Sequence, residues 1–198
     1  MSLEKLIFRD IKAEDIRLSE REAALRLAVP TDFDRSATKE VEKALISAVD
    51  CKLSARRVPI IREDGALIVG SIKIQSSNLS YALDDSKEAF VFGVTLGMGV
   101  ERLLLRLSKL SVSEHYMADA LASAYAEAAI DRAQEILDGI AKTKLRFSPG
   151  YGDLPLEIQP YILSLIEAEK YLGITLSDGL LMKPQKSITA IVGIENEK

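Results

Sequence analysis

Apolar positions along this chain follow two different periods, and the alternation between them predicts both helices and strands. Apolar residues recur every three to four positions over 19–27, 38–53, 100–110, 114–140 and 156–172, which predicts amphipathic helices. The predicted strands, marked by alternation or by a continuous β-prone run, are residues 3–9, 57–62, 66–74, 88–96 and 188–194. This order predicts an α+β fold, in which a mostly antiparallel, twisted sheet carries helices packed on one side of a single compact domain over 1–198.

Capping and turn residues set the expected ends of several elements. Ser19 followed by Glu22 is a capping-box pattern that opens the first helix, and Ser113 is the expected N-cap of the long helix. Asp64-Gly65 between two β-rich runs predicts a hairpin. The isoleucines that share one parity in the second run, and are therefore expected on a buried face, are Ile68, Ile72 and Ile74.

Gly97-Met98-Gly99 follows a predicted strand and precedes a helix, which is the context of phosphate-binding turns. The segment has no third glycine, no acid about 20 residues further on and no P-loop lysine. We therefore interpret it as a tight strand-to-helix turn that packs closely.

Composition excludes several classes of protein. A net charge of −4 over 198 residues argues against a nucleic-acid-binding surface, and no apolar run approaches the roughly 20 residues that span a membrane. The N-terminus has no signal-peptide pattern, and one cysteine, Cys51, forms no internal disulfide, so a cytoplasmic protein is expected.

The scarcity of histidine and cysteine also limits the chemistry. His115 is the only histidine, so neither a zinc site of the usual composition nor a Ser-His-Asp triad is expected. We expect His115 to be a solvated residue in the first turn of its helix and Cys51 to be partly buried and inert. No catalytic or metal-binding residue is predicted.

The segment 146–153 concentrates binding chemistry in eight residues. Pro149 fixes φ at the second position of a tight turn and Gly150 tolerates positive φ at the third. The guanidinium of Arg146 suits a carboxylate or phosphate, and Tyr151 can lie against a flat ring. These features suit a small zwitterionic ligand with a flat heterocycle. The alternative is a helix-to-helix connection with an exposed arginine.

The long alanine-rich helix carries an acidic stripe. Asp119, Ser123, Glu127 and Asp131 recur at i+4 and so share one face. One interpretation is a solvated stripe. The other is that the stripe faces a cationic ligand, or Arg146, across a groove.

Several motifs in the second half of the chain resemble one family. Arg146 to Tyr151 is followed by Glu167-Ala168-Glu169-Lys170, Gly173-Ile174-Thr175-Leu176, Met182-Lys183-Pro184 and Ser187-Ile188-Thr189. In order and approximate spacing over 146–194, these resemble the activation (S-adenosylmethionine-binding) domain of cobalamin-dependent methionine synthase. The resemblance extends more loosely over a core of about 114–194, and the first hundred residues match only in general character.

The resemblance implies a function in reactivation. Such a domain binds S-adenosylmethionine over a corrinoid and supports reductive methylation of cob(II)alamin to methylcobalamin, with an electron from a flavodoxin-like donor. Here the cobalamin is expected on a partner, a methionine synthase that lacks its own activation domain. The chain resembles a short, free-standing form of the domain, with little activity expected alone.

The resemblance also assigns roles to individual residues. Arg146 would pair with the ligand carboxylate, the backbone around Ser148 and Gly150 would contact the adenine edge, and Tyr151 would pack against the ligand. Glu127 would favour the ammonium, the sulfonium or the ribose hydroxyls. Secondary candidates are Asp131 and Pro149.

The chain departs from the family pattern immediately after Tyr151. Residues 152–156 (Gly-Asp-Leu-Pro-Leu) stand where the large enzyme has a Cys-Pro-acid-His segment. Affinity for S-adenosylmethionine is therefore expected to be weak until a partner completes the pocket. Two alternatives remain open: a reactivation factor of another corrinoid methyltransferase system, and a non-catalytic ligand-binding or assembly module.

Overall fold

The sheet is built around β5 (Glu88–Thr95), which is apolar at nearly every position and buried along almost its whole length. In the computed structural model, which describes residues 5–32, 35–63 and 65–196, β5 lies between β2 (Cys51–Glu63) and β9 (Ser187–Ile194). The strand order is β4-β3-β2-β5-β9-β6, with β1 also paired to β2, and every pair is antiparallel. The other strands are β1 (Ile7–Ile11), β3 (Ala66–Val69), β4 (Ile72–Ile74), β6 (Thr143–Phe147) and the separate pair β7 (Thr175–Leu176) and β8 (Met182–Lys183).

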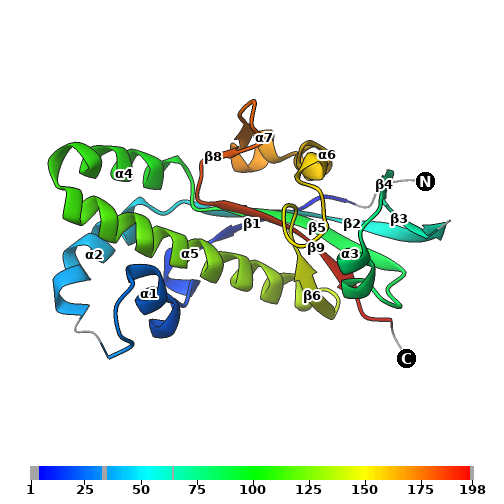
Figure 1. The fold of residues 1–198 in the computed structure, drawn as a ribbon, viewed down its shortest axis with the longest axis horizontal. Coiled ribbons are helices and arrows are strands. Elements are labelled where there is room, and N and C mark those ends of the chain that lie inside the picture. The colour runs from blue at the N-terminus through cyan, green and yellow to red at the C-terminus, as the bar shows by residue number, and fades with distance from the viewer. Residues whose placement is uncertain (1–4, 33–34, 64, 197–198) are drawn as a thin grey trace.

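Helices cover both faces of this sheet (Figure 1). The α-helices are α1 (Glu20–Leu27), α2 (Lys39–Ala48), α3 (Ser77–Ala82), α4 (Met98–Leu110), α5 (Val112–Asp138), α6 (Gln159–Leu165) and α7 (Ala168–Leu172). Three short 3₁₀ segments are described, at Ala13–Asp15, Arg35–Thr38 and Leu156–Ile158. The predicted α+β class and mostly antiparallel sheet in one compact fold are confirmed.

The prediction that helices pack on one side is wrong for the shorter helices. Phe90 and Phe92 of β5 point into one core cluster with residues of α1, α2, α4 and α5. Ala89 and Val91 point into a second cluster with residues of α3, α6 and α7. Both faces of the central strand are apolar, so each must be covered to remove it from water.

The alanine-rich helix α5 is central to the first of these clusters. It contacts α1, α2, α4 and the sheet, and its alanines are mostly buried. Small side chains allow these elements to approach closely. The N-cap is Ser111, whose hydroxyl accepts a hydrogen bond from the Glu114 N–H, rather than the predicted Ser113.

The helix predicted over 38–53 ends earlier, at Ala48. Asp50 N–H donates to the Leu96 carbonyl at 3.0 Å, and Cys51 already pairs with Ile11 of β1. Helical periodicity therefore extends past the point where pairing with distant strands determines the backbone. The helix at 19–27 is confirmed, but Ser19 makes no side-chain capping bond, and Glu22 binds Arg26 instead.

The strand predicted over 66–74 is divided by a turn at Gly70, whose φ is +65°. In β3, Ala66, Leu67 and Val69 are buried and Ile68 is half-buried, so the predicted parity is wrong there. In β4, beyond the turn, Ile74 is buried as predicted and Ile72 is half-buried. The hairpin is confirmed by the pairing of β2 with β3, although residue 64 itself lies outside the described residues.

The helix predicted over 156–172 is interrupted by Glu167, which adopts a φ of +50°. The interruption separates α6 from α7, and Gly173 ends α7 in the left-handed region, as expected. The tight turn at 97–99 is confirmed: Gly97 has a φ of +84°, and a Cβ on Gly99 would lie closer than 3.0 Å to the Ala48 carbonyl oxygen.

Candidate functional site

A groove of about 590 Å³ opens where the end of β6, the loop after it, α5 and the segment before β9 meet. Its size is within the usual range for small-molecule sites. The groove is lined by Glu127, Leu145, Arg146, Phe147, Ser148, Pro149, Tyr151, Leu156, Gln159, Leu180, Leu181, Met182, Gln185, Ser187, Ile188 and Thr189. Five of the predicted site residues are therefore in one place: Glu127, Arg146, Ser148, Pro149 and Tyr151.

The predicted tight turn forms one wall of this groove. Tyr151 N–H donates to the Ser148 carbonyl at 3.3 Å, and Gly150 has a φ of +84°, as expected for a turn with proline second and glycine third. Gly150 is not among the lining residues, and its N–H donates to the Leu154 carbonyl at 3.0 Å. Gly150 therefore contributes through the shape of the turn, and its N–H is used within the loop.

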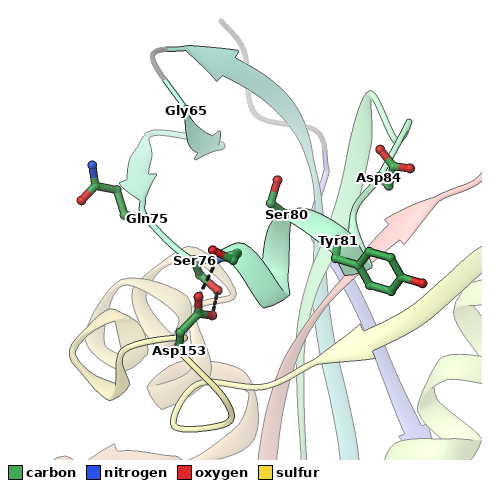
Figure 2. A pocket seen from close by; sticks show the side chains of 8 residues that line it. Gly65, Gln75, Ser76, Ser80, Tyr81, Asp84 and Asp153 are labelled. Carbon is green, nitrogen blue, oxygen red and sulfur yellow. Dashed lines mark hydrogen bonds between the residues drawn. The ribbon is translucent and has the colours of Figure 1, made fainter.

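The residues after Tyr151 fasten this loop to α3. The carboxylate of Asp153 accepts a hydrogen bond from the Ser76 hydroxyl (Figure 2) and further bonds from the backbone N–H groups of Ser77 and Asn78. These bonds, with the Ser76 hydroxyl first, hold the pKa of Asp153 below its ordinary value. The segment that departs from the family pattern thus has a structural role, because it fixes the position of the turn.

Arg146 reaches the groove from β6, which pairs with β9 at the sheet edge. Its guanidinium Nη2 lies 2.7 Å from Asp131 Oδ1, and its Nη1 donates to Gln134 Oε1 at 3.2 Å. Asp131 does not line the groove; it stands behind Arg146 on α5. The alternative of a helix-to-helix connection with an exposed arginine is wrong, because Arg146 is on a strand, half-buried and paired.

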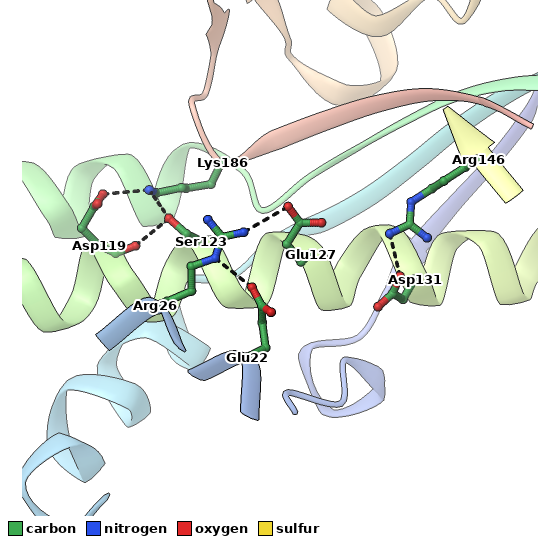
Figure 3. Close-up of polar contacts among 8 residues, drawn as sticks. All are labelled: Glu22, Arg26, Asp119, Ser123, Glu127, Asp131, Arg146 and Lys186. Atoms are coloured by element: carbon green, nitrogen blue, oxygen red, sulfur yellow. Dashed lines mark hydrogen bonds and ion pairs between the residues drawn. The ribbon is translucent and has the colours of Figure 1, made fainter. Parts of the chain in front are cut away.

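The acidic stripe on α5 meets a cation at each carboxylate (Figure 3). Lys186 Nζ lies 2.8 Å from Asp119 Oδ1 and donates to the Ser123 hydroxyl at 2.9 Å. One turn before Asp131, Glu127 Oε1 lies 3.3 Å from Arg26 Nη2. The second interpretation of the stripe is therefore correct in that Arg146 faces it, at Asp131.

Arg26 comes from α1, far away in sequence, and is divided between two acids. Its Nε donates to Glu22 Oε1 at 2.8 Å, one helical turn earlier, while its Nη2 contacts Glu127 at the longer distance of 3.3 Å. The hydrogen bond to Glu22 is the main reason that the pKa of Arg26 is raised; burial opposes the shift, and Glu127 and Tyr151 add to it. Arg26 is thus electrostatically coupled to two residues that line the groove.

A buried polar pair forms the floor of the groove. Gln159 Nε2 donates to the Thr189 hydroxyl at 2.8 Å, and the same hydroxyl donates back to Gln159 Oε1 at 3.0 Å. Gln159 Nε2 also contacts Met182 Sδ at 3.2 Å. This pair joins α6 to β9 beneath the groove.

The rim of the groove is apolar and exposed. Leu145, Tyr151, Leu156 and Leu181 all line the groove and are exposed large side chains. A contiguous apolar rim around a groove with a few polar groups is typical of a surface that binds a ligand or a protein.

Sequence reasoning did not select two polar residues that line the groove, Gln159 and Gln185, or Arg26, which lies in the adjoining hollow and contacts Glu127. Arg26 and Gln159 lie in ordinary amphipathic segments, so the hydrophobic pattern around them did not mark them as site residues. The motifs Met182-Lys183-Pro184 and Ser187-Ile188-Thr189 carried the resemblance, and both contribute to the lining.

The lone histidine and cysteine lie outside the groove. His115 is half-buried, with Nδ1 3.1 Å from the Leu104 carbonyl oxygen, so it is less solvated than expected. Cys51 is buried, and this burial raises the pKa of its thiol to about 12, which fits the expected inertness. Within the described residues, no group of three or more His, Cys, Asp or Glu side chains is arranged to hold a metal ion. Nor does any helix of the described parts have the length and apolar character to cross a membrane.

Comparison with known proteins finds similarity in structure but not in sequence. No family model and no curated protein matches this chain. Among solved structures, the chain is similar to the crystal structure of the MetH reactivation domain bound to AdoHcy, with a probability of 1.00 and a TM-score of 0.68. The match covers 98% of this chain and 79% of that chain at 14% sequence identity. The chain therefore has the fold of the MetH reactivation domain, in agreement with the resemblance of its motifs.

Proposed function

We propose that this protein is an S-adenosylmethionine-binding reactivation module that acts on a cobalamin-dependent methionine synthase as a separate subunit. In this role it supports the return of cob(II)alamin to methylcobalamin. The observation that carries the proposal is the presence of Arg146 and Glu127 on one groove, within the fold of the MetH reactivation domain. That structure holds AdoHcy, the demethylated form of the proposed ligand.

The groove offers complementary groups for each part of this ligand. The half-buried guanidinium of Arg146 suits the carboxylate, and the carboxylate of Glu127 suits the ammonium or the sulfonium. The rigid Ser148–Tyr151 turn and the apolar rim supply surface for the flat adenine ring. A volume of about 590 Å³ leaves room for a nucleoside with an amino-acid chain.

The chain itself supplies binding and orientation. When bound, S-adenosylmethionine supplies the methyl group and cobalamin accepts it, so the bond-making chemistry resides in these groups. The groove residues of this chain include no histidine, cysteine or lysine. We place the cobalamin on the partner and propose a flavodoxin-like protein as the electron donor.

The first test is calorimetric titration with S-adenosylmethionine. Arg146→Ala should weaken binding by on the order of 2–4 kcal/mol, because a charge-assisted contact to the carboxylate is lost. Arg132→Ala is a matched control: Arg132 is on α5, its Nη1 lies 2.9 Å from Glu135, and it does not line the groove. Equal affinities for the two variants would contradict the assignment of Arg146.

The second test is reactivation of a methionine synthase that lacks its activation domain. Cob(II)alamin enzyme, S-adenosylmethionine and a reductant are mixed with this protein, and formation of methylcobalamin is followed by absorbance. Ligand binding without reactivation would favour a different corrinoid methyltransferase as the partner. No ligand binding at all would favour a non-catalytic assembly module.

A further inference from the structure

The two charged residues on which the proposed ligand depends are each paired with a residue of opposite charge from this chain. Arg146 contacts Asp131 at 2.7 Å, and Glu127 contacts Arg26 at 3.3 Å (Figure 3). The carboxylate of Asp131 has the chemistry of the ligand carboxylate, and the guanidinium of Arg26 is a cation, as the ligand ammonium is. The groove thus carries internal substitutes for both charges of an amino-acid group.

The Arg146–Asp131 pair can be exchanged at low cost. The Asp131 side chain is 63% exposed, so its carboxylate is readily hydrated when it leaves Arg146, whose own side chain is only 27% exposed. Arg146 also keeps Gln134, which is itself held by hydrogen bonds to Thr143 and to the Lys144 carbonyl. The guanidinium therefore remains in place while its carboxylate partner changes.

The Glu127–Arg26 pair is exchangeable for a different reason. Arg26 holds Glu22 through its Nε at 2.8 Å, a shorter contact than the one to Glu127. When Arg26 leaves Glu127, it retains this bond within α1. Glu127 lines both the ligand groove and the adjoining surface hollow that contains Arg26, so its carboxylate stands at the boundary between the two.

We propose that Asp131 and Arg26 are internal competitors for the amino-acid end of the ligand: they hold Arg146 and Glu127 until a carboxylate and an ammonium displace them, and so lower the affinity for such ligands alone. This inference rests on the proposed function. A ligand that carries both a carboxylate and an ammonium replaces both internal partners. A nucleoside without these groups leaves both pairs intact and gains nothing from Arg146 or Glu127, so it binds only through the turn and the apolar rim.

The test compares two ligands across matched variants by calorimetry: S-adenosylhomocysteine, which has the amino-acid end, and 5′-methylthioadenosine, which does not. Asp131→Asn and Arg26→Gln each remove one internal competitor. Exposed ion pairs of this kind correspond to about a two- to fivefold change in an equilibrium constant. Each variant should bind S-adenosylhomocysteine about two- to fivefold more tightly and 5′-methylthioadenosine with unchanged affinity. Arg132→Gln, which removes an ion pair elsewhere on α5, should change neither affinity.

Weaker binding of S-adenosylhomocysteine by Asp131→Asn or Arg26→Gln would overturn the proposal, because it would make that residue a direct ligand contact. Unchanged affinity in both variants, or equal gains for both ligands, would overturn it as well. In each of these cases the proposed function would stand if Arg146→Ala abolished binding. If only the Asp131→Asn/Arg26→Gln double variant binds S-adenosylhomocysteine, the result supports the proposal. If neither the wild type nor any variant binds it, both the proposal and the proposed function are overturned.

Discussion

The buried pair of Gln159 and Thr189 offers the sharpest test of how the groove is held together. Each residue is 2% exposed, and two hydrogen bonds of 2.8 and 3.0 Å join the side chains. Thr189→Val keeps the shape of the side chain and removes its hydroxyl. The Gln159 amide then keeps only Met182 Sδ at 3.2 Å, and a thioether sulfur is a weak acceptor.

The expected cost follows from the groups left without partners. A buried amide oxygen and one amide N–H lose their bonds, and an unsatisfied buried polar group costs about 1–3 kcal/mol. We expect Thr189→Val to lower the free energy of unfolding by about 2–3 kcal/mol in urea titrations, with an unchanged m-value. Binding of S-adenosylhomocysteine should weaken as well, because α6 is no longer fixed to β9 beneath the ligand.

A double-mutant cycle provides the control. Gln159→Leu alone leaves the Thr189 hydroxyl unpaired and should also destabilise the protein. The double variant Gln159→Leu/Thr189→Val removes both polar groups, so its free energy of unfolding should differ from that of the wild type by less than about 1 kcal/mol. A Thr189→Val protein within about 0.5 kcal/mol of the wild type, or a double variant whose loss equals the sum of the single losses, would refute the reasoning.

Two further predictions concern the fold away from the groove. Gly99→Ala should lower the free energy of unfolding by about 1–3 kcal/mol, since its Cβ would overlap the Ala48 backbone oxygen. Gly179→Ala, with nothing within 4 Å, is the matched control, and equal urea midpoints would contradict the prediction. Burial raises the pKa of Cys51 from 9.0 to about 12, so the thiol should resist modification at pH 8 until the protein unfolds. Because the folded state binds this proton more tightly, the stability it contributes is complete below pH 9 and is lost as pH rises toward 12; Cys51→Ala should lack that loss.

The sequence predicted those parts of the fold that depend on local chemistry. Pro149 and Gly150 specify their turn because each fixes or permits one φ value, and that turn is present. The continuous run of β-prone residues at 88–96 likewise predicted a central strand from local composition. The predictions were wrong where contacts with distant strands determine the backbone conformation. Cys51, for example, pairs with β1 although the helical period of apolar residues continues through it.

The candidate site was predictable in its residue types and less so in its pairings. The i+4 spacing placed Glu127 and Asp131 on one face, which the structure confirms. Nothing in that spacing could say that Arg146 would take Asp131 as its partner, or that Arg26, 101 residues before Glu127, would reach the same stripe. Gln159 and Thr189 meet across 30 residues, between α6 and β9, and no local pattern in the sequence marks that pairing.

The acidic stripe on α5 holds the cationic side chains around the groove in position. Lys186 from the segment before β9, Arg26 from α1 and Arg146 from β6 come from three separate parts of the chain, and each is aligned against a different carboxylate of one rigid helix. Repulsion between the neighbouring acids is relieved by these cations. Successive i+4 positions lie about 6 Å apart along the helix axis, so the spacing of the acids fixes the spacing of the cations. Helix α5 thereby positions Arg146, whose guanidinium faces the groove, through Asp131. One turn away, the same helix carries Glu127, whose carboxylate is proposed to bind the cationic part of the ligand.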